Sequence, residues 1–298
     1  MSIKKITIVG TGVMGHPMAA HLLEAGYDLT VFARHREKIE DLLEKGAHYA
    51  DTLKDAAKDA DAIITMLPTE DIVKENIFCE NGLADGAKKG TIFFNSSTVS
   101  PEANKYIGEE LLKRGMRFGE TPVTGSGLQA QAKTLVFLYV GDEEDYQEAL
   151  PVLRAMGVDA YYASNQYGAG AYAKIASNAM MAINMLSFAE AITMATKAGV
   201  NPEMFVKFCH GGGPQSAMAD KKISKIINRD FSPTFRTALM YKDAGLASDL
   251  SKKLEVPTPM LGLGKELYKM ACIKGLADED NCAVIKCYEE WAGIEIKV

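Results

Sequence analysis

The stretch "KKITIVGTGVMGHPMAAHLLEAG", residues 4–26, decides the fold of the first half of the chain. An apolar, β-branched run leads into Gly10, Gly12 and Gly15, and an amphipathic segment that ends in Gly26 follows. Glycines in G-x-G-x-x-G spacing permit a tight turn, close approach of the backbone to a pyrophosphate, and close packing of a helix on a strand. The alternative is an ordinary glycine turn. However, the glycine motif lies between a predicted strand and a predicted helix, and this position favours a dinucleotide site.

Strand and helix signals alternate along the rest of the first half. The candidate strands cover residues 6–10, 29–33, 62–68, 91–95, 117–120 and 135–141. Amphipathic stretches between them end in the glycine expected just past a helix C-terminus. This alternation predicts an α/β fold, with a mostly parallel sheet covered by helices on both faces.

The second half has a different period. From about Tyr167 the sequence shows long helical repeats, and the run over residues 172–188 is apolar nearly all round, as in a helix enclosed by others. We therefore expect an all-helical second half, joined by a long helix that starts beside the first domain and continues into the second. The interdomain cleft is expected near residues 168–178.

Composition excludes several classes of protein. The chain has 298 residues, a net charge of -6 and no dense Lys/Arg run, which argues against nucleic acid or an anionic membrane as a partner. Its five cysteines are scattered, so they predict no metal site and no disulfide framework, and a reducing, cytoplasmic location is expected. The N-terminus lacks the features of a signal peptide, and the apolar run at 175–189 is too short and too polar to span a bilayer.

The end of the second strand bears on the choice of dinucleotide. NAD enzymes usually carry an acid there, whereas NADP requires a cation for its 2'-phosphate. Residues 31–38 read "VFARHREK", with Arg34, His35 and Arg36 and no acid at that point. This predicts a preference for NADP(H), with Arg34 as the best contact and NAD(H) still usable. Alternatively, Arg36 pairs with Glu40 one turn later.

Two further strand ends are expected beside the nicotinamide, because ligands of open α/β sheets lie beyond the carboxyl ends of the strands. They are "TMLP" at 65–68 and "NSSTVSP" at 95–101. Ser100 and Pro101 also have the pattern of a helix start, which leaves Thr98 unexplained.

The stretch "GAGAYAKIASN", residues 168–178, places one lysine before a long apolar segment. Lys174 and Asn178 are four residues apart and share a helix face. Partial burial would lower the pKa of the lysine towards useful proton transfer. Residue chemistry alone leaves Lys174 open between a solvated helix-start lysine and a proton carrier.

Three other stretches could carry chemistry. "ETPVTGSG" at 120–127 could present N–H groups and the Thr124 hydroxyl to an anion, or be a flexible turn. Lys242 and Asp243 begin a helical stretch and could be an ordinary exposed pair. His210, beside a glycine run, is an alternative acid or base.

In chain order, "GTGVMGHPMAAHL", "ITMLP", "SSTVSP", "TPVTGSG", "GAGAYAKIASN" and "YKDAGLA" resemble the β-hydroxyacid dehydrogenase family, over nearly the whole chain. That family includes 3-hydroxyisobutyrate dehydrogenases and tartronate and glyoxylate/succinic semialdehyde reductases. The resemblance implies a Rossmann NADP(H)-binding domain at 1–164 and an all-helical substrate and oligomerisation domain at 165–298. It further implies a small carboxylate-bearing substrate bound between the domains, and a homodimer or homotetramer.

The same resemblance implies a role for each site residue. Lys174 would protonate the nascent alkoxide during reduction and take the proton back during oxidation, and Asn178 would hold the substrate near it. Lys242 would close over cofactor and substrate. The substrate carboxylate would be received by Thr124, Gly125 and Ser126. The implied cofactor contacts are Gly10, Gly12, Val13, Met14, Gly15, Arg34, Met66, Leu67, Pro68, Thr98 and Lys242.

Some residues depart from the family pattern. The substrate loop usually reads Pro-Val-Ser-Gly-Gly, whereas this chain has Thr124 for the serine and Ser126 for the second glycine, and Asn95 replaces a common aspartate. These changes leave the identity of the hydroxy acid or semialdehyde open. An imine reductase of the same architecture usually lacks the lysine, so Lys174 speaks against that alternative. A noncatalytic dinucleotide-binding module would be expected to have lost both the lysine and the loop.

Overall fold

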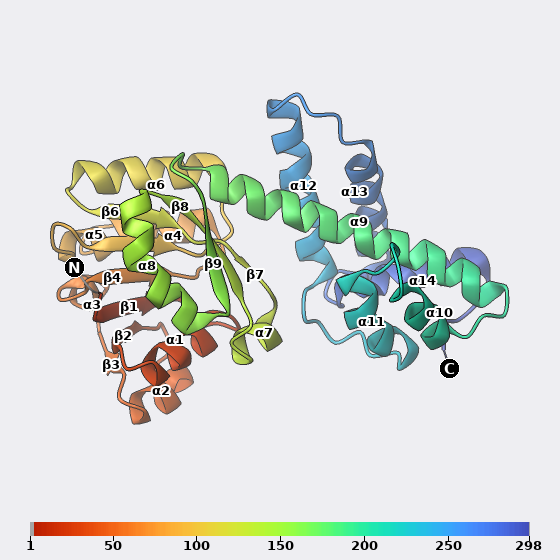
Figure 1. Ribbon diagram of the computed structural model, residues 1–298, viewed down its shortest axis with the longest axis horizontal. Coiled ribbons are helices and arrows are strands. Elements are labelled where there is room, and N and C mark those ends of the chain that lie inside the picture. The colour runs from red at the N-terminus through yellow and green to blue at the C-terminus, as the bar shows by residue number, and fades with distance from the viewer. Residues whose placement is uncertain (1–2, 298) are drawn as a thin grey trace. The chain divides into compact units, whose positions relative to one another are not determined.

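The computed structural model describes residues 3–297, and Figure 1 shows its elements along the chain. The chain folds as two compact units, the first ending at Lys174 and the second beginning at Ile175. Helix α9 (Ala169–Lys197) runs through this division, as expected for the long connecting helix. The domain boundary expected between residues 164 and 165 lies just ahead of α9 and stays a prediction.

One mixed sheet forms the centre of the first unit. Its strands are β1 (Lys5–Val9), β2 (Asp28–Phe32), β3 (His48–Tyr49), β4 (Ala62–Thr65), β5 (Ile92–Asn95), β6 (Arg117–Glu120), β7 (Val123–Thr124), β8 (Val136–Gly141) and β9 (Asp159–Ser164). They lie in the order β3-β2-β1-β4-β5-β6-β8-β7, with β9 paired to β8. The first six strands are parallel, whereas β8 is antiparallel to both β6 and β7. The predicted parallel sheet is confirmed for these six strands.

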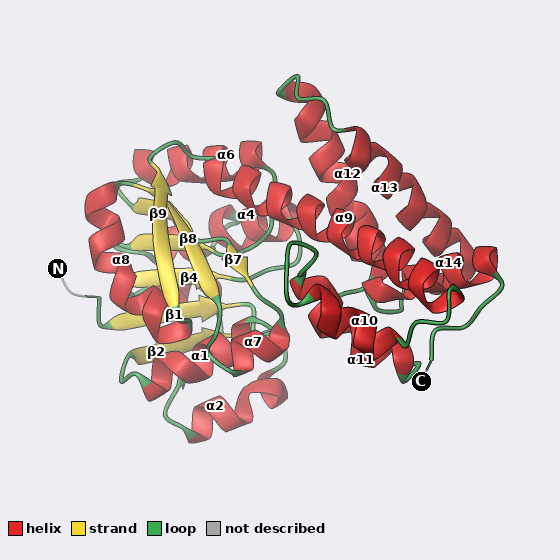
Figure 2. Ribbon diagram, turned by 45° about the vertical axis from the view of Figure 1, so that its right-hand side comes forward, coloured by secondary structure: helices red, strands yellow, loops and turns green. Residues whose placement is uncertain are grey.

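Helices cover both faces of this sheet, as Figure 2 shows around the yellow strands. They are α1 (Gly15–Glu24), α2 (Glu40–Glu44), α3 (Leu53–Ala57), α4 (Glu70–Phe78), α5 (Leu83–Gly86), α6 (Pro101–Lys113), α7 (Gly127–Gln131) and α8 (Glu143–Met156), with a 3₁₀ turn η1 (Arg36–Ile39). Strand side chains alternate between two cores. Ile64 and Phe94 belong to the core with α1 and α8. Ile63 and Phe93 belong to the core with α4 and α6.

Three strands were not predicted from the sequence. β3 and β7 have two residues each, too few to show a period. β9 reads "DAYYAS", where small and aromatic residues stand at successive positions and obscure the alternation. Conversely, the strand expected over 62–68 ends at Thr65, and the next three residues leave the sheet. The predicted helix start at Ser100 is confirmed, since its side chain accepts from Ala103 N–H and Pro101 opens α6.

The second unit is helical, and its described part contains no strand, as predicted. After α9 it contains α10 (Pro202–Cys209), α11 (Ala217–Ile227), α12 (Thr237–Lys253), α13 (Pro259–Ala271), a π-helical turn η2 (Cys272–Leu276), a 3₁₀ turn η3 (Asn281–Val284) and α14 (Ile285–Ala292). Among the described residues, α9 is the one helix long and apolar enough to cross a membrane, because it extends beyond the apolar run at 175–189 at both ends. Met185, Ala189 and Ile192 of α9 lie in the core of this unit, whereas Met180 and Met194 of the same helix are exposed.

A buried ion pair fixes the loop that precedes α12. The Asp280 carboxylate is fully buried and accepts from Lys222 Nζ at 2.7 Å, and Lys222 is itself buried. The same carboxylate accepts from Thr234 N–H at 2.9 Å and the Thr234 hydroxyl at 2.7 Å. Burial tends to raise the pKa of Asp280, but Lys222 and Thr234 hold it down at about 2. Asp280 therefore joins α11, the loop and η3 through one charge.

Candidate functional site

The glycine turn after β1 has the geometry that a dinucleotide requires. Gly10 has φ +102°, and a Cβ there would lie 2.2 Å from the Met66 carbonyl oxygen. A Cβ on Gly15 would lie 1.9 Å from the Gly10 oxygen, so both positions exclude a side chain. Gly12 is exposed, with no atom within 4 Å of the Cβ position, and α1 begins without a side-chain cap. Open space above uncapped N–H groups fits the diphosphate of a dinucleotide.

The arginines after β2 have different surroundings. Arg36 lies over the Tyr49 ring, with its guanidinium carbon 5.0 Å from the ring centroid, and within the described residues it has no ion pair with Glu40. Arg34 is exposed and has no ion-pair partner among residues 3–297. The structure therefore leaves the Arg34 guanidinium available to an anion.

The ends of β4 and β5 are tied together. Leu67 N–H donates to Ser97 Oγ at 2.9 Å, and Ser97 N–H donates to Asn95 Oδ1 at 3.1 Å. Met66 N–H donates to the Val9 carbonyl, which keeps "TMLP" beside the glycine turn. Thr98 is the next residue after Ser97 and is half-buried. The two strand ends expected beside the nicotinamide thus lie together in the first unit.

The loop after β7 lies against the glycine turn. A Cβ on Gly127 would come within 2.3 Å of Val13 Cγ1. Gly125 has φ +136°, so the second position of the loop at 124–126 requires glycine. Thr124 is exposed, while Ser126 is the N-cap residue of α7 and its N–H donates to Gln129 Oε1 at 3.0 Å. Of the three predicted carboxylate contacts, the Ser126 N–H is therefore already engaged.

A buried glutamate outside the predicted site residues holds the start of α9. Glu120 ends β6 and is fully buried; its carboxylate accepts from the N–H groups of Gly168 and Ala171 and from Asn104 Nδ2. Burial raises the pKa of Glu120 to about 7, against the opposing effect of these hydrogen bonds. Lys174 is half-buried and lies three residues after Ala171 on the same helix.

The second unit holds the other predicted substrate contacts. Asn178 is buried on α9, and its Nδ2 donates to Asp243 Oδ2 at 2.7 Å. Lys242 Nζ lies 3.1 Å from Asp243 Oδ1. Asp243 is buried, so Lys242 and Asp243 are not an ordinary exposed pair. The sequence could have indicated Asp243 only through its position one residue after Lys242.

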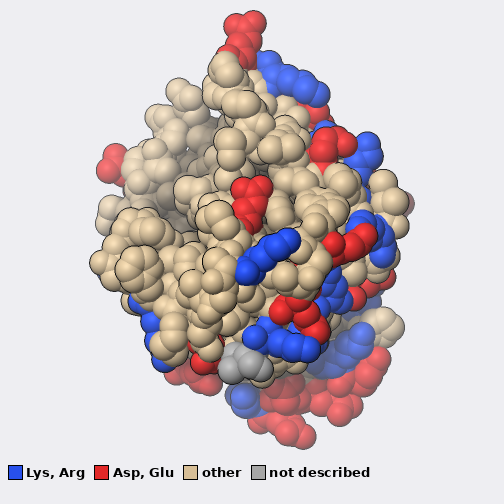
Figure 3. Space-filling model, turned by 90° about the vertical axis from the view of Figure 1, so that its right-hand side faces the viewer, with Lys and Arg blue, Asp and Glu red and all other residues tan. Residues whose placement is uncertain are grey.

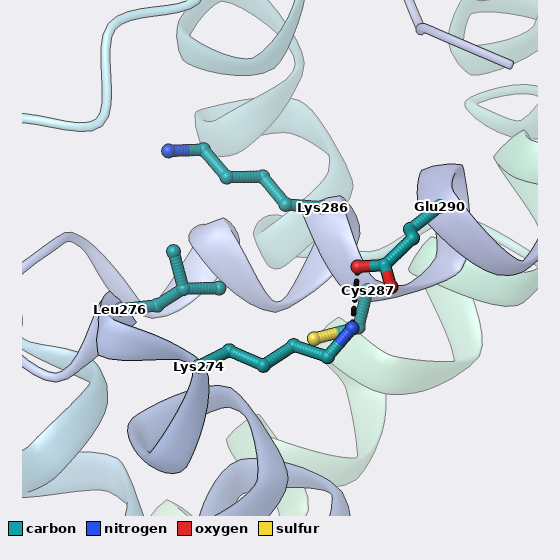
Figure 4. Close-up of a pocket in the computed structure, with 5 residues that line it drawn as sticks. All are labelled: Lys274, Leu276, Lys286, Cys287 and Glu290. Carbon is teal, nitrogen blue, oxygen red and sulfur yellow. Dashed lines mark hydrogen bonds and ion pairs between the residues drawn. The ribbon is translucent and has the colours of Figure 1, made fainter.

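Two other features belong to the second unit. His210 is exposed and contacts Asp220 with its Nδ1 at 3.1 Å, so its ring has a surface partner. A hollow in the second unit is lined by Lys274, Leu276, Lys286, Cys287 and Glu290, and Figure 4 shows Lys274 paired with Glu290. Lys286 pairs with Glu279, so both cations of the hollow are neutralised. None of the predicted site residues lines it.

Two family models together match most of the chain. One, described as the NAD binding domain of 6-phosphogluconate dehydrogenase, matches residues 5–167. The other, described as "NAD-binding of NADP-dependent 3-hydroxyisobutyrate dehydrogenase", matches residues 168–288.

Individual relatives match over nearly their whole length. The mitochondrial 3-hydroxyisobutyrate dehydrogenase of Drosophila melanogaster is 34% identical, over 94% of this chain and 88% of the relative. The 3-sulfolactaldehyde reductase of Escherichia coli K12 is 33% identical, over 98% of each chain. The solved 3-hydroxyisobutyrate dehydrogenase of Mycobacterium tuberculosis with L-serine has a TM-score of 0.85 and 30% identity, covering 97% of this chain and 99% of that one.

Proposed function

Because the chain belongs to the β-hydroxyacid dehydrogenase family, we propose that it is an NAD(P)-dependent oxidoreductase that interconverts a small carboxylate-bearing β- or γ-hydroxy acid and its aldehyde or ketone. The observation that carries the proposal is the half-buried Lys174 on a helix whose first turn is hydrogen-bonded to Glu120 of the dinucleotide-binding sheet. An imine reductase usually lacks this lysine, and a noncatalytic module would have no need of it.

A bound nicotinamide would supply the hydride in reduction and accept it in oxidation. Lys174, in its ammonium form, would donate a proton to the carbonyl oxygen as that oxygen gains negative charge, and its amine would take the proton back in oxidation. The Thr124 hydroxyl and Gly125 N–H would receive the substrate carboxylate. The Ser126 N–H donates to Gln129 instead.

Asn178 would contact the substrate with its remaining amide groups. One N–H of its Nδ2 is used by Asp243, which fixes the direction of the amide and leaves Oδ1 able to accept a hydroxyl proton. Lys242, beside Asp243, would close over cofactor and substrate. Asp243 thus joins the proposed site as the residue that orients the Asn178 amide and carries the negative charge beside the Lys242 ammonium.

The experiment that tests this function is a steady-state screen of the purified protein with NADPH and NADH. Suitable carbonyl acids are glyoxylate, succinic semialdehyde, methylmalonate semialdehyde, tartronate semialdehyde and sulfolactaldehyde, with the hydroxy acids for the reverse direction. Loss of reduced nicotinamide absorbance with at least one acid is expected. One pocket side chain changes selection by roughly 1 to 3 kcal/mol, so the best acid is found by measurement. A protein that binds the cofactor and turns over none of them would contradict the proposal.

We propose that NADP(H) is preferred and that Arg34 recognises its 2'-phosphate. The Arg34→Ala variant is expected to weaken NADPH binding by about 10- to 100-fold, because a charged hydrogen bond contributes about 1.5 to 3 kcal/mol. NADH has no phosphate at that position, so its affinity should change little. Fluorescence titration with both cofactors measures this, with the exposed Lys38→Ala as the matched control. An equal loss of affinity for NADPH and NADH would contradict the assignment of Arg34 to the 2'-phosphate.

We also propose that the second unit forms a homodimer or homotetramer. Large apolar side chains are exposed on it, including Phe208 at 81%, Ile273 at 77% and Met194 at 73%. Figure 3 shows a face with a broad area free of charged side chains. Exposed apolar area of this kind favours association. Light scattering is expected to give a mass of two or four chains, and a monomer at working concentration would contradict the proposal.

A further inference from the structure

A continuous set of buried hydrogen bonds joins the start of α9 to the strand ends beside the glycine turn. Asn104 Nδ2 donates to Glu120 Oε2 at 2.8 Å, and Asn95 Nδ2 donates to Asn104 Oδ1 at 2.7 Å. Asn95 Oδ1 in turn accepts from the Thr65 hydroxyl at 3.0 Å and from Ser97 N–H at 3.1 Å. All five side chains are at least nine-tenths buried, so water cannot substitute for a lost partner.

Glu120 sets the direction of every bond in this set. In its ionised form the Glu120 carboxylate can only accept, and in that form Asn104 must turn its Nδ2 towards Glu120 and its Oδ1 towards Asn95. Asn95 must then present its Oδ1 to Ser97. If the side chain at position 120 could also donate, the amides of Asn104 and Asn95 could both rotate by half a turn. Ser97 N–H would then face the Asn95 Nδ2 and lose its acceptor.

The same carboxylate determines how α9 begins. The Glu120 carboxylate oxygens accept from the N–H groups of Gly168 and Ala171 at the N-terminus of α9. A negative charge is favourable at a helix N-terminus. Gly168 has φ +100°, and a Cβ on Gly170 would lie 2.8 Å from Glu120 Oε2. The carboxylate therefore excludes a side chain at Gly170 and accepts from the backbone N–H of Gly168.

We propose that Glu120 is a positioning residue that holds the Lys174 turn of α9 and the Asn95–Thr98 loop in one fixed frame. The inference rests on the proposed function of Lys174. Glu120 moves no proton in this role; it acts through the backbone of α9 and through Asn104. The consequence is that proton donor and nicotinamide pocket cannot shift independently within the first unit.

The test uses Glu120→Gln, alone and together with Asn104→Asp. In the single variant, one amide N–H₂ must face either the α9 N–H groups or Asn104 Nδ2. We expect kcat to fall by about 10- to 100-fold, the effect of a small misplacement of reacting groups, with a much smaller change in NADPH affinity. In the double variant the new amide can donate to the new carboxylate, which still accepts from Asn95, so most of kcat should return.

Two further measurements separate positioning from stability. Asp145→Asn replaces another buried carboxylate of the first unit and weakens its 2.6 Å ion pair with Arg117. This variant should lower the melting temperature without lowering kcat. Hydrogen exchange should accelerate both at 168–174 and at 95–98 in Glu120→Gln, and slow again in the double variant. This readout needs no turnover, so it decides the role of Glu120 even if no acid is reduced and the proposed function fails. Unchanged exchange at 95–98, or a kcat loss that the second change does not reverse, overturns the inference.

Discussion

Replacing Lys174 with methionine is expected to lower kcat by about 10²- to 10⁴-fold, the contribution of a general acid or base. Methionine matches the apolar stem of the lysine and lacks only its terminal ammonium, so the start of α9 should pack much as before. NADP(H) affinity should change little, because the glycine turn and Arg34 belong to other elements of the first unit. Single-turnover kinetics with fluorescence titration of the cofactor measures the two quantities separately.

A Lys174→Arg variant distinguishes proton transfer from charge. Arginine keeps the positive charge but does not release its proton at working pH, so it should be nearly as inactive as methionine. Activity close to that of the unmodified protein in Lys174→Arg would mean that the cation, and not the proton, is what the reaction uses. Full activity in Lys174→Met would contradict both a proton-transfer role and a charge role for Lys174.

Replacing Asp280 with alanine is expected to lower the free energy of unfolding of the second unit by about 3 to 5 kcal/mol. The change leaves the buried Lys222 ammonium without its carboxylate, and an uncompensated buried charge is costly. Thr234 loses an acceptor as well, so the loop before α12 should loosen. Urea unfolding followed by circular dichroism measures the loss.

Two controls isolate the buried charge of Asp280. Asp59→Ala removes a carboxylate of the exposed Lys88 pair and should matter little, because such pairs are solvated. Asp280→Leu with Lys222→Met removes both charges and should be much less harmful than Asp280→Ala, since matched apolar replacements of buried pairs are often nearly neutral. A double variant as unstable as Asp280→Ala would contradict the charge-based explanation.

Acid should reproduce part of this loss. The ordinary pKa of the carboxyl is 3.8, and it is about 2 in the folded protein. Protonation therefore favours the unfolded chain, and the contribution of Asp280 is complete above about pH 4 and disappears as the pH falls towards 2. The difference in stability between the unmodified protein and Asp280→Asn should shrink over that interval.

The sequence predicted those parts of the fold that local patterns determine. The glycine turn, the first six strands of the sheet other than β3, and the helix start at Ser100 follow from spacing, alternation and capping chemistry, all read within a few residues. β3 and β7 escaped because a two-residue strand is defined by its partner and not by its own pattern. Their partners lie elsewhere in the chain.

The candidate site divides in the same way. Lys174 stands out in the sequence because the residues around it are small and apolar, which is a local signal. Glu120 and Asp243 do not, because each is buried by bonds to distant residues: Gly168 lies 48 positions from Glu120, and Asn178 lies 65 from Asp243. Glu120 is followed by "TPVT" and Asp243 is preceded by a lysine, and neither local sequence indicates a distant hydrogen-bond partner.

The capping of α9 by Glu120 also has a consequence for the order in which the chain acquires its structure. The acceptor for the first N–H groups of α9 sits at the end of β6, so this turn gains its partner only once that strand has joined the sheet. During synthesis, the strand emerges well before the helix does. A fragment that starts at residue 165 would contain every residue of α9 and still lack the group on which its first turn closes.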